Sequence, residues 1–253
     1  MGRGLEFAVG LLNGAVGDYL VRTGNGLATP MAFIHHQRPL TLEPGTLKQE
    51  YPTASSRLCV LVHGVMCNED IFRFPNGEDY GTMLQRDVGF TPLYLRYNSG
   101  LPIPDNGADF SQVLTQLVAA WPTAVTELLL VGYSMGGLVV RSACHVAALQ
   151  ALPWLGLVKR AIYVGTPHRG APMERAGRVL AKVLHAVDDP YTRLFAQVAN
   201  LRSDGVKDLG DADLTEEDRA SRNWTALTDK NHPVPLLASI RHQLIAGSVR
   251  KSG

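Results

Sequence analysis

The sequence predicts a three-layer α/β fold, in which helices cover both faces of a mostly parallel central sheet. Three observations lead to this prediction: short apolar runs alternate with helical segments, several runs are apolar throughout, and glycine-containing motifs directly follow three of them. Strands that alternate with helices are typical of right-handed βαβ units, and continuous apolar runs fit strands buried on both faces. We expect one domain over residues 1–253, with an insertion.

The N-terminal segment, residues 1–56, is expected to add a helix and an edge segment. Residues 5–22 read as an amphipathic helix docked on the domain, since the polar face carries few Lys or Arg residues for a membrane surface. The apolar residues recur at spacings of three and four: Leu5, Val9, Leu12, Val16 and Leu20. Residues 27–42, which contain prolines, are expected to hold one or two edge strands.

The core, residues 57–170, is expected to hold four strands and two helices. Apolar, β-rich runs predict strands at 58–62, 91–97, 128–131 and 158–164. Apolar residues at helical spacing predict helices at 110–120 and 135–150. Motifs follow three of these strands, so we expect the motifs to meet at the carboxyl edge of the sheet, where open parallel sheets place their active sites.

The character of the chain changes after residue 170, and residues 171–235 read as a helical cap inserted over the sheet. An apolar stripe predicts a helix at 176–187, and a second helix is expected at 191–202. The acidic stretch 204–218 lacks the spacing of an EF-hand Ca²⁺ loop and reads as a solvated lid loop. Residues 236–253 are expected to hold the last visible core strand, from Arg241 to Ser248.

Ser134 lies at the centre of Gly132-Tyr133-Ser134-Met135-Gly136, between an apolar strand and a helix. This context is typical of a nucleophile elbow, in which a strained turn presents a serine at its apex. Side chains in place of Gly132 and Gly136 are expected to collide with neighbouring backbone. We expect Ser134 to be a catalytic nucleophile, which needs a histidine base that is itself oriented by an acid.

The segment His63-Gly64-Val65-Met66 follows an earlier strand and is expected to form part of an oxyanion hole. Such a hole needs two backbone N–H donors aimed at one point. We expect one from Met135, the residue after the serine, and the other from Val65. His63, beside the turn residue Gly64, is expected to fix this loop by hydrogen bonds, because a histidine base before the serine is the wrong order for this arrangement.

Two further histidine features are interpreted as structural. Gly165-Thr166-Pro167-His168 follows the strand next to that of Ser134, and His168 is expected to shape its loop. His35 and His36 form a pair without matching ligands nearby and read as an ordinary loop feature. No metal site is therefore expected.

The His63-Gly64 loop, the turn Gly132–Gly137 and the segment Gly165–His168 together resemble the lipase and esterase branch of the α/β-hydrolase superfamily. Residues 203–209 are similar to a segment of bacterial lipase-like proteins related to the GPI inositol-deacylases. The resemblance covers about residues 57–250. It implies an α/β-hydrolase fold and serine-dependent hydrolysis of a small-molecule or lipid carboxylic ester, without a metal or an organic cofactor.

The same resemblance places the triad acid after the strand that follows the cap, and the histidine after the last strand. Residues 249–253 contain no Asp, Glu or His. Three explanations stay open: a copy that lacks the C-terminal strand and helix, with acid and histidine beyond Gly253; an internal triad; or a non-catalytic binding module. The internal candidates are Asp229 with His232, His242, and His185 with Asp188 or Asp189. Acyl transfer to an alcohol or amine is a further alternative to hydrolysis.

Composition narrows the partners and the compartment. The formal net charge is +1 and the basic residues are dispersed, which excludes a nucleic-acid surface. Cys59, Cys67 and Cys144 fit no metal-ligand spacing and read as small buried hydrophobes in a reducing cytosol. The sequence has no run of about 18 apolar residues and no convincing export signal. We therefore expect a cytoplasmic protein without a transmembrane segment, with peripheral membrane association and oligomeric state left open.

Overall fold

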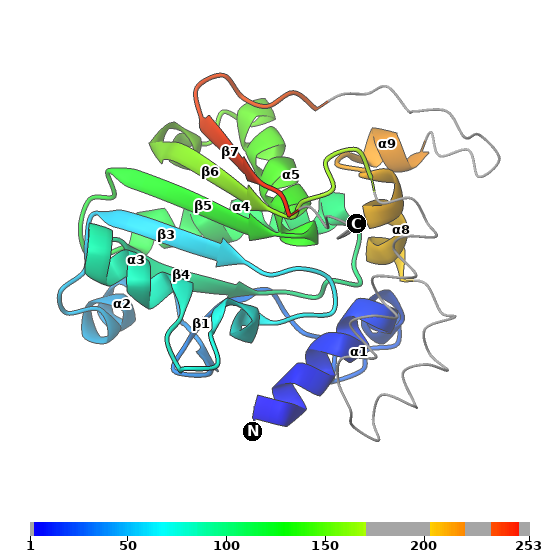
Figure 1. Ribbon diagram of the computed structural model, residues 1–253, viewed down its shortest axis with the longest axis horizontal. Coiled ribbons are helices and arrows are strands. Elements are labelled where there is room, and N and C mark those ends of the chain that lie inside the picture. Colours follow the sequence, from blue (N-terminus) through cyan, green and yellow to red (C-terminus); the bar gives the residue numbers. More distant parts are fainter. Residues whose placement is uncertain (1–2, 171–202, 221–233, 248–253) are drawn as a thin grey trace, which may run out of the picture.

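Seven strands form one sheet, in the order β2-β1-β4-β3-β5-β6-β7 (Figure 1). The computed structural model describes residues 3–170, 203–220 and 234–247. The strands are β1 (Ala32–His35), β2 (Arg38–Pro39), β3 (Arg57–Val62), β4 (Thr91–Arg96), β5 (Glu127–Tyr133), β6 (Val158–Val164) and β7 (Arg241–Ile245). Strands β3 to β7 are parallel to their neighbours among themselves, and β1 and β2 add an antiparallel edge. The predicted strands and the mostly parallel sheet are confirmed.

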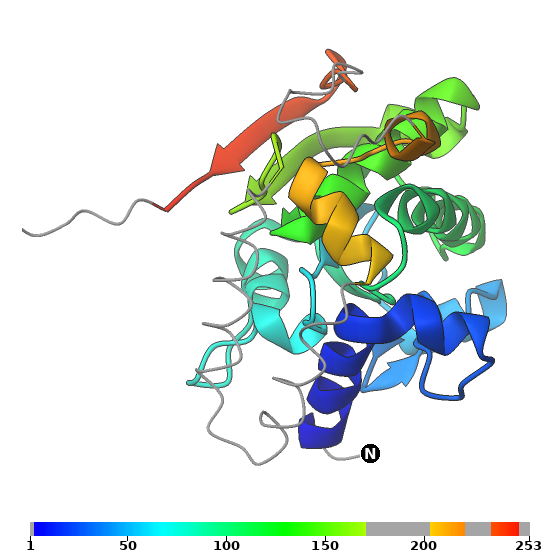
Figure 2. The same cartoon turned by 90° about the vertical axis from the view of Figure 1, so that its right-hand side faces the viewer.

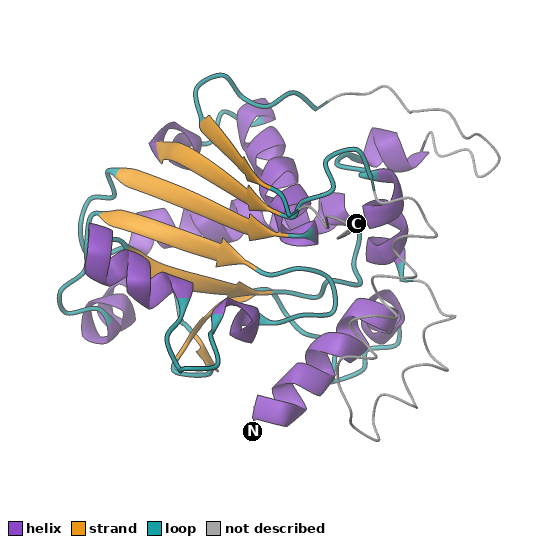
Figure 3. Cartoon of the chain, viewed as in Figure 1, coloured by secondary structure: helices purple, strands orange, loops and turns teal. Residues whose placement is uncertain are grey.

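Helices cover both faces of this sheet, as the three-layer prediction requires (Figure 3). The helices are α1 (Arg3–Arg22), α2 (Pro44–Glu50), α3 (Tyr80–Val88), α4 (Ile103–Ala120), α5 (Met135–Leu149), α8 (Asp204–Asp211) and α9 (Glu216–Ala220), with short 3₁₀ turns η1 (Glu69–Phe72) and η2 (Pro153–Leu157). Helices α4 and α5 pack on one face, and α3 packs on the other.

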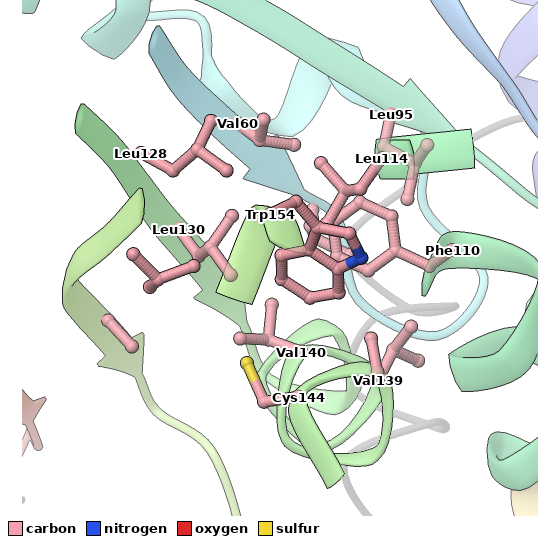
Figure 4. Close-up of a cluster of buried hydrophobic side chains, with 14 of the residues drawn as sticks. Val60, Leu95, Phe110, Leu114, Leu128, Leu130, Val139, Val140, Cys144 and Trp154 are labelled. Atoms are coloured by element: carbon pink, nitrogen blue, oxygen red, sulfur yellow. The ribbon is translucent and has the colours of Figure 1, made fainter. Parts of the chain in front are cut away.

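The core divides between the two faces because successive strand residues point to opposite sides. Leu58, Val60 and Val62 of β3 join the cluster under α4 and α5, whereas Cys59 and Leu61 face the α3 side. Figure 4 shows the larger cluster, in which Trp154 lies among side chains of β3, β5, α4 and α5. Each fully buried Leu or Val side chain contributes on the order of 1.5–3 kcal/mol, so this cluster carries much of the fold's stability.

The cysteines are free thiols, and their burial differs. Cys59 and Cys144 are buried, as predicted, and burial raises the pKa of the Cys144 thiol to about 12. Cys67 is only partly buried, so the prediction of three buried cysteines is wrong at this position.

Helix α4 begins at Ile103, seven residues before the start predicted from the sequence. Pro102 occupies the N-cap and Pro104 lies in the first turn, where a missing N–H breaks no helical hydrogen bond. The N-cap residue supplies no side-chain cap. Instead, the N–H of Ile103 donates to Oδ2 of the buried Asp208 at 2.8 Å.

The acidic stretch 204–218 is not a solvated loop, and that prediction is wrong. It forms α8 and α9, which stand beyond the carboxyl ends of the strands (Figure 2). Asp208, Asp213 and Asp218 are buried. Oδ2 of Asp218 accepts hydrogen bonds from the N–H groups of Leu214 and Thr215, at 3.0 and 3.2 Å. The carboxylates therefore organise this segment, because buried acids need donors to offset desolvation.

Helix α1 docks on the domain, as predicted, but through a different face. Leu20 is the one residue of the predicted stripe that is buried, and the other buried residues are mostly small or polar: Leu11, Asn13, Gly14, Ala15 and Gly17. Leu5 of the predicted stripe is exposed. Glycine at positions 14 and 17 lets the helix approach closely: an added Cβ at Gly17 would lie 1.8 Å from Asn98 Oδ1.

An ion-pair cluster holds α1 to the sheet. Arg96 of β4 pairs with Glu69 of η1 and with Glu6 of α1. Burial alone would raise the pKa of the Glu69 carboxyl, but hydrogen bonds and charge from Arg96 hold it below its usual range.

Several predicted features lie outside the described residues. They are the helices at 176–187 and 191–202 and the internal triad candidates His185, Asp188, Asp189, Asp229 and His232.

Within the described ranges, no helix is both long and apolar enough to cross a membrane.

Candidate active site at the carboxyl end of the sheet

Three loops meet where the parallel strands end. The register pairs Val62 of β3 with Gly132 of β5, and Gly132 with Tyr163 of β6, so the loops after these strands leave the same edge. The chain continues from β3 to β4 on one side, whereas β5 and β6 lie on the other side. The gap between β3 and β5 is thus a topological switch point, where open α/β sheets bind ligands.

Ser134 occupies the turn between β5 and α5, with φ 51° and ψ −122°. A positive φ is uncommon for a residue other than glycine and marks a strained backbone. The N–H of Ser134 donates to the carbonyl of Val164 at 2.8 Å, which fixes the turn against β6. The side chain is half-buried, at the start of a helix whose first N–H groups lack helical partners.

Glycines allow the chain to fold tightly around this serine. A Cβ atom added to Gly132 would lie 2.4 Å from Cα of Gly137, and one added to Gly136 would lie 2.3 Å from the carbonyl oxygen of Val62. A Cβ on Gly64 would lie 3.0 Å from Cβ of Ser134. The loop after β3 therefore passes directly beside the serine, and any side chain at these positions would push the parts apart.

Val65 and Met135 carry the two backbone N–H groups that the sequence predicts as oxyanion donors. Within the described part of the chain, the N–H groups of Val65 and Met135 donate to no other group. Met66, which follows Val65, has a backbone φ of 57°. Its N–H donates a hydrogen bond to the Ser99 hydroxyl at 3.0 Å. Ser99 therefore anchors the loop that carries Val65, a role that its sequence position does not reveal.

His63 holds the same loop in place, as predicted. It is fully buried, its Nδ1 lies 2.8 Å from the carbonyl oxygen of Gly64, and its Nε2 accepts from the N–H of Tyr97 at 3.3 Å. Since a carbonyl only accepts and an amide N–H only donates, the proton lies on Nδ1. Burial lowers the pKa of His63 to about 4, so the imidazole is neutral at pH 7.

His168 shapes the third loop through a network of side chains. Its Nδ1 accepts from the Arg141 guanidinium at 3.2 Å, and its ring packs edge-on against Tyr163. Arg141 also donates to the carbonyl of Val234 at 2.6 Å. Burial and the charge of Arg141 lower the pKa of His168 to about 4. Arg141 thus ties α5 to this loop and to residue 234, a link not anticipated from the sequence.

No histidine in the described ranges hydrogen-bonds to Ser134. His242, one of the internal candidates, lies within β7 with both nitrogens engaged. Its Nδ1 lies 3.0 Å from the Tyr163 hydroxyl, and its Nε2 lies 3.1 Å from the carbonyl oxygen of Leu237. These contacts suit a structural histidine better than a base.

The segment Ser203–Leu209, noted in the sequence for its resemblance, supports the site from outside the sheet. Ser203 donates to the carbonyl of Gly14 at 2.7 Å, and the N–H of Gly205 donates to the carbonyl of Gly100 at 3.0 Å. A Cβ at Gly205 would lie 2.3 Å from the carbonyl oxygen of Ser99. This segment therefore packs on the loop that holds Ser99, one step removed from Val65.

The PGAP1-like alpha/beta domain family model matches residues 110–242, more than half of the chain. Among solved structures, Bacillus licheniformis lipase BlEst2 in its mature form has a TM-score of 0.48 and 20% identity, covering 76% of this chain and 65% of the lipase. This chain therefore spans less than two thirds of that lipase. The search of curated proteins found no match.

Two esterases are also similar. The Pyrococcus furiosus esterase PF2001 has a TM-score of 0.40 and 12% identity over 58% of this chain and 53% of its own. A marine microorganism esterase has a TM-score of 0.39 and 11% identity over 77% of this chain and 88% of its own.

The strand order, the parallel core and the helices on both faces define an α/β-hydrolase fold, as predicted. The family match is more specific: the chain belongs to the PGAP1-like alpha/beta domain family.

Proposed function

We propose that this protein hydrolyses carboxylic esters with Ser134 as the nucleophile. The observation that carries the proposal is the backbone of Ser134, whose φ of 51° holds the side chain at the apex of a strand–helix turn. The similarity to lipases and esterases in the comparisons agrees with the proposal without adding to its argument.

In the proposed reaction, Ser134 Oγ attacks the ester carbonyl carbon, and the carbonyl oxygen becomes an oxyanion. The N–H groups of Val65 and Met135 stabilise this oxyanion. A histidine base takes the serine proton and gives it to the departing alkoxide, which leaves as an alcohol. In the second half of the reaction the histidine takes a proton from water, and the water oxygen attacks the acyl carbon. The bond to Ser134 Oγ then breaks, the histidine returns the proton to Oγ, and the carboxylic acid leaves.

The base and its acid are proposed to come from outside the described residues. In the given sequence, the histidines that lie outside the described residues are His185 and His232. The substrate is proposed to carry an apolar acyl group, because Val65, beside Ser134, is an apolar and only partly buried residue. Met66 packs with Leu11 and Phe7 of α1, and Val65 borders the same cluster.

A second candidate is a hydrolase-like binding module. It is favoured by one observation, which is that no histidine among the described residues bonds to Ser134. The two candidates differ in turnover of an ester, not in ester binding.

Hydrolysis of p-nitrophenyl esters of increasing acyl length separates these candidates. Ser134→Ala is expected to lower kcat by about 10³-fold or more. Ser56→Ala, at the opposite end of β3, serves as the matched control and should keep full activity. A folded wild-type protein without turnover, or equal turnover in Ser134→Ala, would contradict the hydrolase proposal.

A further inference from the structure

A second cluster of chemically active side chains lies at the β1–β2 hairpin, on a surface that the Ser134 site does not use. His35 ends β1, His36 begins the hairpin turn, and Glu50 ends α2. One ligand atom from each lies within 4.8 Å of the others. The expectation that the histidine pair has no ligand nearby is wrong, because α2 brings Glu50 next to it.

His35 Nε2 faces the Glu50 carboxylate, but no hydrogen bond joins the two groups. The atom is buried and makes no hydrogen bond. Oε2 of Glu50 lies 3.4 Å away. Zn²⁺ bonds of about 2.0–2.1 Å to nitrogen and about 2.0–2.2 Å to oxygen, at the tetrahedral angle, put two ligand atoms about 3.4 Å apart. The spacing therefore fits two ligands of one metal ion.

The other nitrogen of His35 is held by an outer contact of the kind that orients metal-binding histidines. The Tyr51 hydroxyl lies 3.1 Å from Nδ1. Tyr51 is itself packed against Trp121, with ring centroids 4.9 Å apart. A metal ion at Nε2 requires the tautomer in which Nδ1–H donates to the Tyr51 hydroxyl, and this contact allows that tautomer.

The other two side chains are placed at a local energetic cost. His36 and Gln37 have φ values of 46° and 64°, the left-handed pair of a tight hairpin turn in which Asn and Gly are preferred. Glu50 lies at the C-terminus of α2, where the helix dipole disfavours an anion. A bound cation would offset the unfavourable position of the Glu50 carboxylate. A role as metal ligand would explain why histidine occupies the left-handed position 36.

We propose that His35, His36 and Glu50 bind one divalent transition-metal ion of the Zn²⁺ type. The exposed side chain of His36 rotates toward the other two to complete three protein ligands. The remaining position opens on a cavity of about 670 Å³ between the hairpin, the end of α2, α3 and β4. Three protein ligands with one open position are typical of zinc sites that bind a water or a small ligand. The ion would also fasten the hairpin to α2.

The test is calorimetric titration of the chelator-treated full chain with ZnCl₂. Wild type is expected to bind one Zn²⁺ per chain. His36→Asn removes a ligand but suits the left-handed turn, and Glu50→Gln removes a ligand but suits the helix C-terminus, so both variants should stay folded. Each is expected to weaken Zn²⁺ binding by roughly 10-fold or more, as is Tyr51→Phe, which removes the outer contact.

His145→Gln, on α5, is the matched control for histidine content and should bind Zn²⁺ like wild type. The proposal is overturned if wild type shows no saturable binding, or if His36→Asn and Glu50→Gln bind as tightly as wild type. Loss of binding in the His145→Gln control would also overturn it, because the ion would then lie elsewhere. Thermal melts of each metal-free variant establish that the comparison is between folded proteins.

Discussion

The carboxylate of Asp208 caps helix α4: its Oδ2 accepts a hydrogen bond of 2.8 Å from the N–H of Ile103, 105 residues away in sequence. Asp208 is fully buried, and Arg219 approaches its other oxygen at 3.4 Å. One acid thus joins α8, α9 and the helix that covers the core face of the sheet.

Removing this cap should destabilise the whole domain. Asp208→Ala leaves a buried N–H without a partner, which costs about 1–3 kcal/mol. Glu217→Ala, which removes an exposed acid of the same segment, should stay within about 0.5 kcal/mol of wild type. Urea unfolding of both variants measures the difference. Equal free energies of unfolding for the two variants would show that the carboxylate is not a structural cap.

The turn around Ser134 should reject even a methyl group. In Gly136→Ala, the new Cβ would lie 2.3 Å from the Val62 carbonyl oxygen, so the backbone must shift. We expect a loss of about 1–3 kcal/mol in the free energy of unfolding. Gly156→Ala is the control, because nothing lies within 4 Å of an added Cβ there. A Gly136→Ala melt as high as that of the control would contradict the close approach.

His63 should make the domain less stable in mild acid. Burial lowers its pKa to about 4 in the folded protein, whereas the same histidine has a pKa of about 6.5 in the unfolded chain. Between these values the unfolded state binds more protons, so stability falls as the pH drops. From this residue we expect a loss of about 2 kcal/mol between pH 8 and pH 5.

The measurement is urea unfolding of wild type and His63→Gln across that range. Whatever the starting stability of the variant, its decline toward pH 5 should be shallower than that of wild type by the same amount. Parallel declines would mean that His63 does not stay neutral in the folded protein.

Ser99 should affect turnover through the loop that carries Val65. Ser99→Ala removes the acceptor for the Met66 N–H, a hydrogen bond of 3.0 Å. A hydrogen bond of this kind contributes about 0.5–1.5 kcal/mol. If that free energy is lost from transition-state stabilisation, kcat falls roughly 2- to 10-fold, with KM little changed. Ser111→Ala is the control, since the Ser111 hydroxyl is buried without a hydrogen bond in the described structure. A change in KM alone, or equal kcat in both variants, would contradict this role.

The sheet was predictable from the sequence because its signals are local. The strands β3 and β5 are apolar after their first residue, β6 is apolar from Ala161 on, and each ends at a glycine- or histidine-containing motif at the same sheet edge. Helix α3 was missed although its signals are present, since Asp79 and Thr82 form a capping box and Gly89 ends the helix.

The errors arose where distant residues decide the outcome. The acid Asp208 looks solvated until Ile103, far along the chain, is placed against it. The buried face of α1 is set by close approach of Gly14 and Gly17 to other loops, which outweighs the stripe of larger apolar residues. His36 and Glu50 meet only because the hairpin and α2 fold together. Periodicity cannot reveal such contacts.

The most direct test of the central claim is intact mass spectrometry after exposure of the protein to a fluorophosphonate. If Ser134 is an activated nucleophile, wild type gains one phosphonyl group with loss of fluoride, and Ser134→Ala gains none. His185→Gln and His232→Gln, tested beside them, should show which histidine activates the serine. A folded wild-type protein that gains no adduct, or an adduct that persists in Ser134→Ala, would contradict the account.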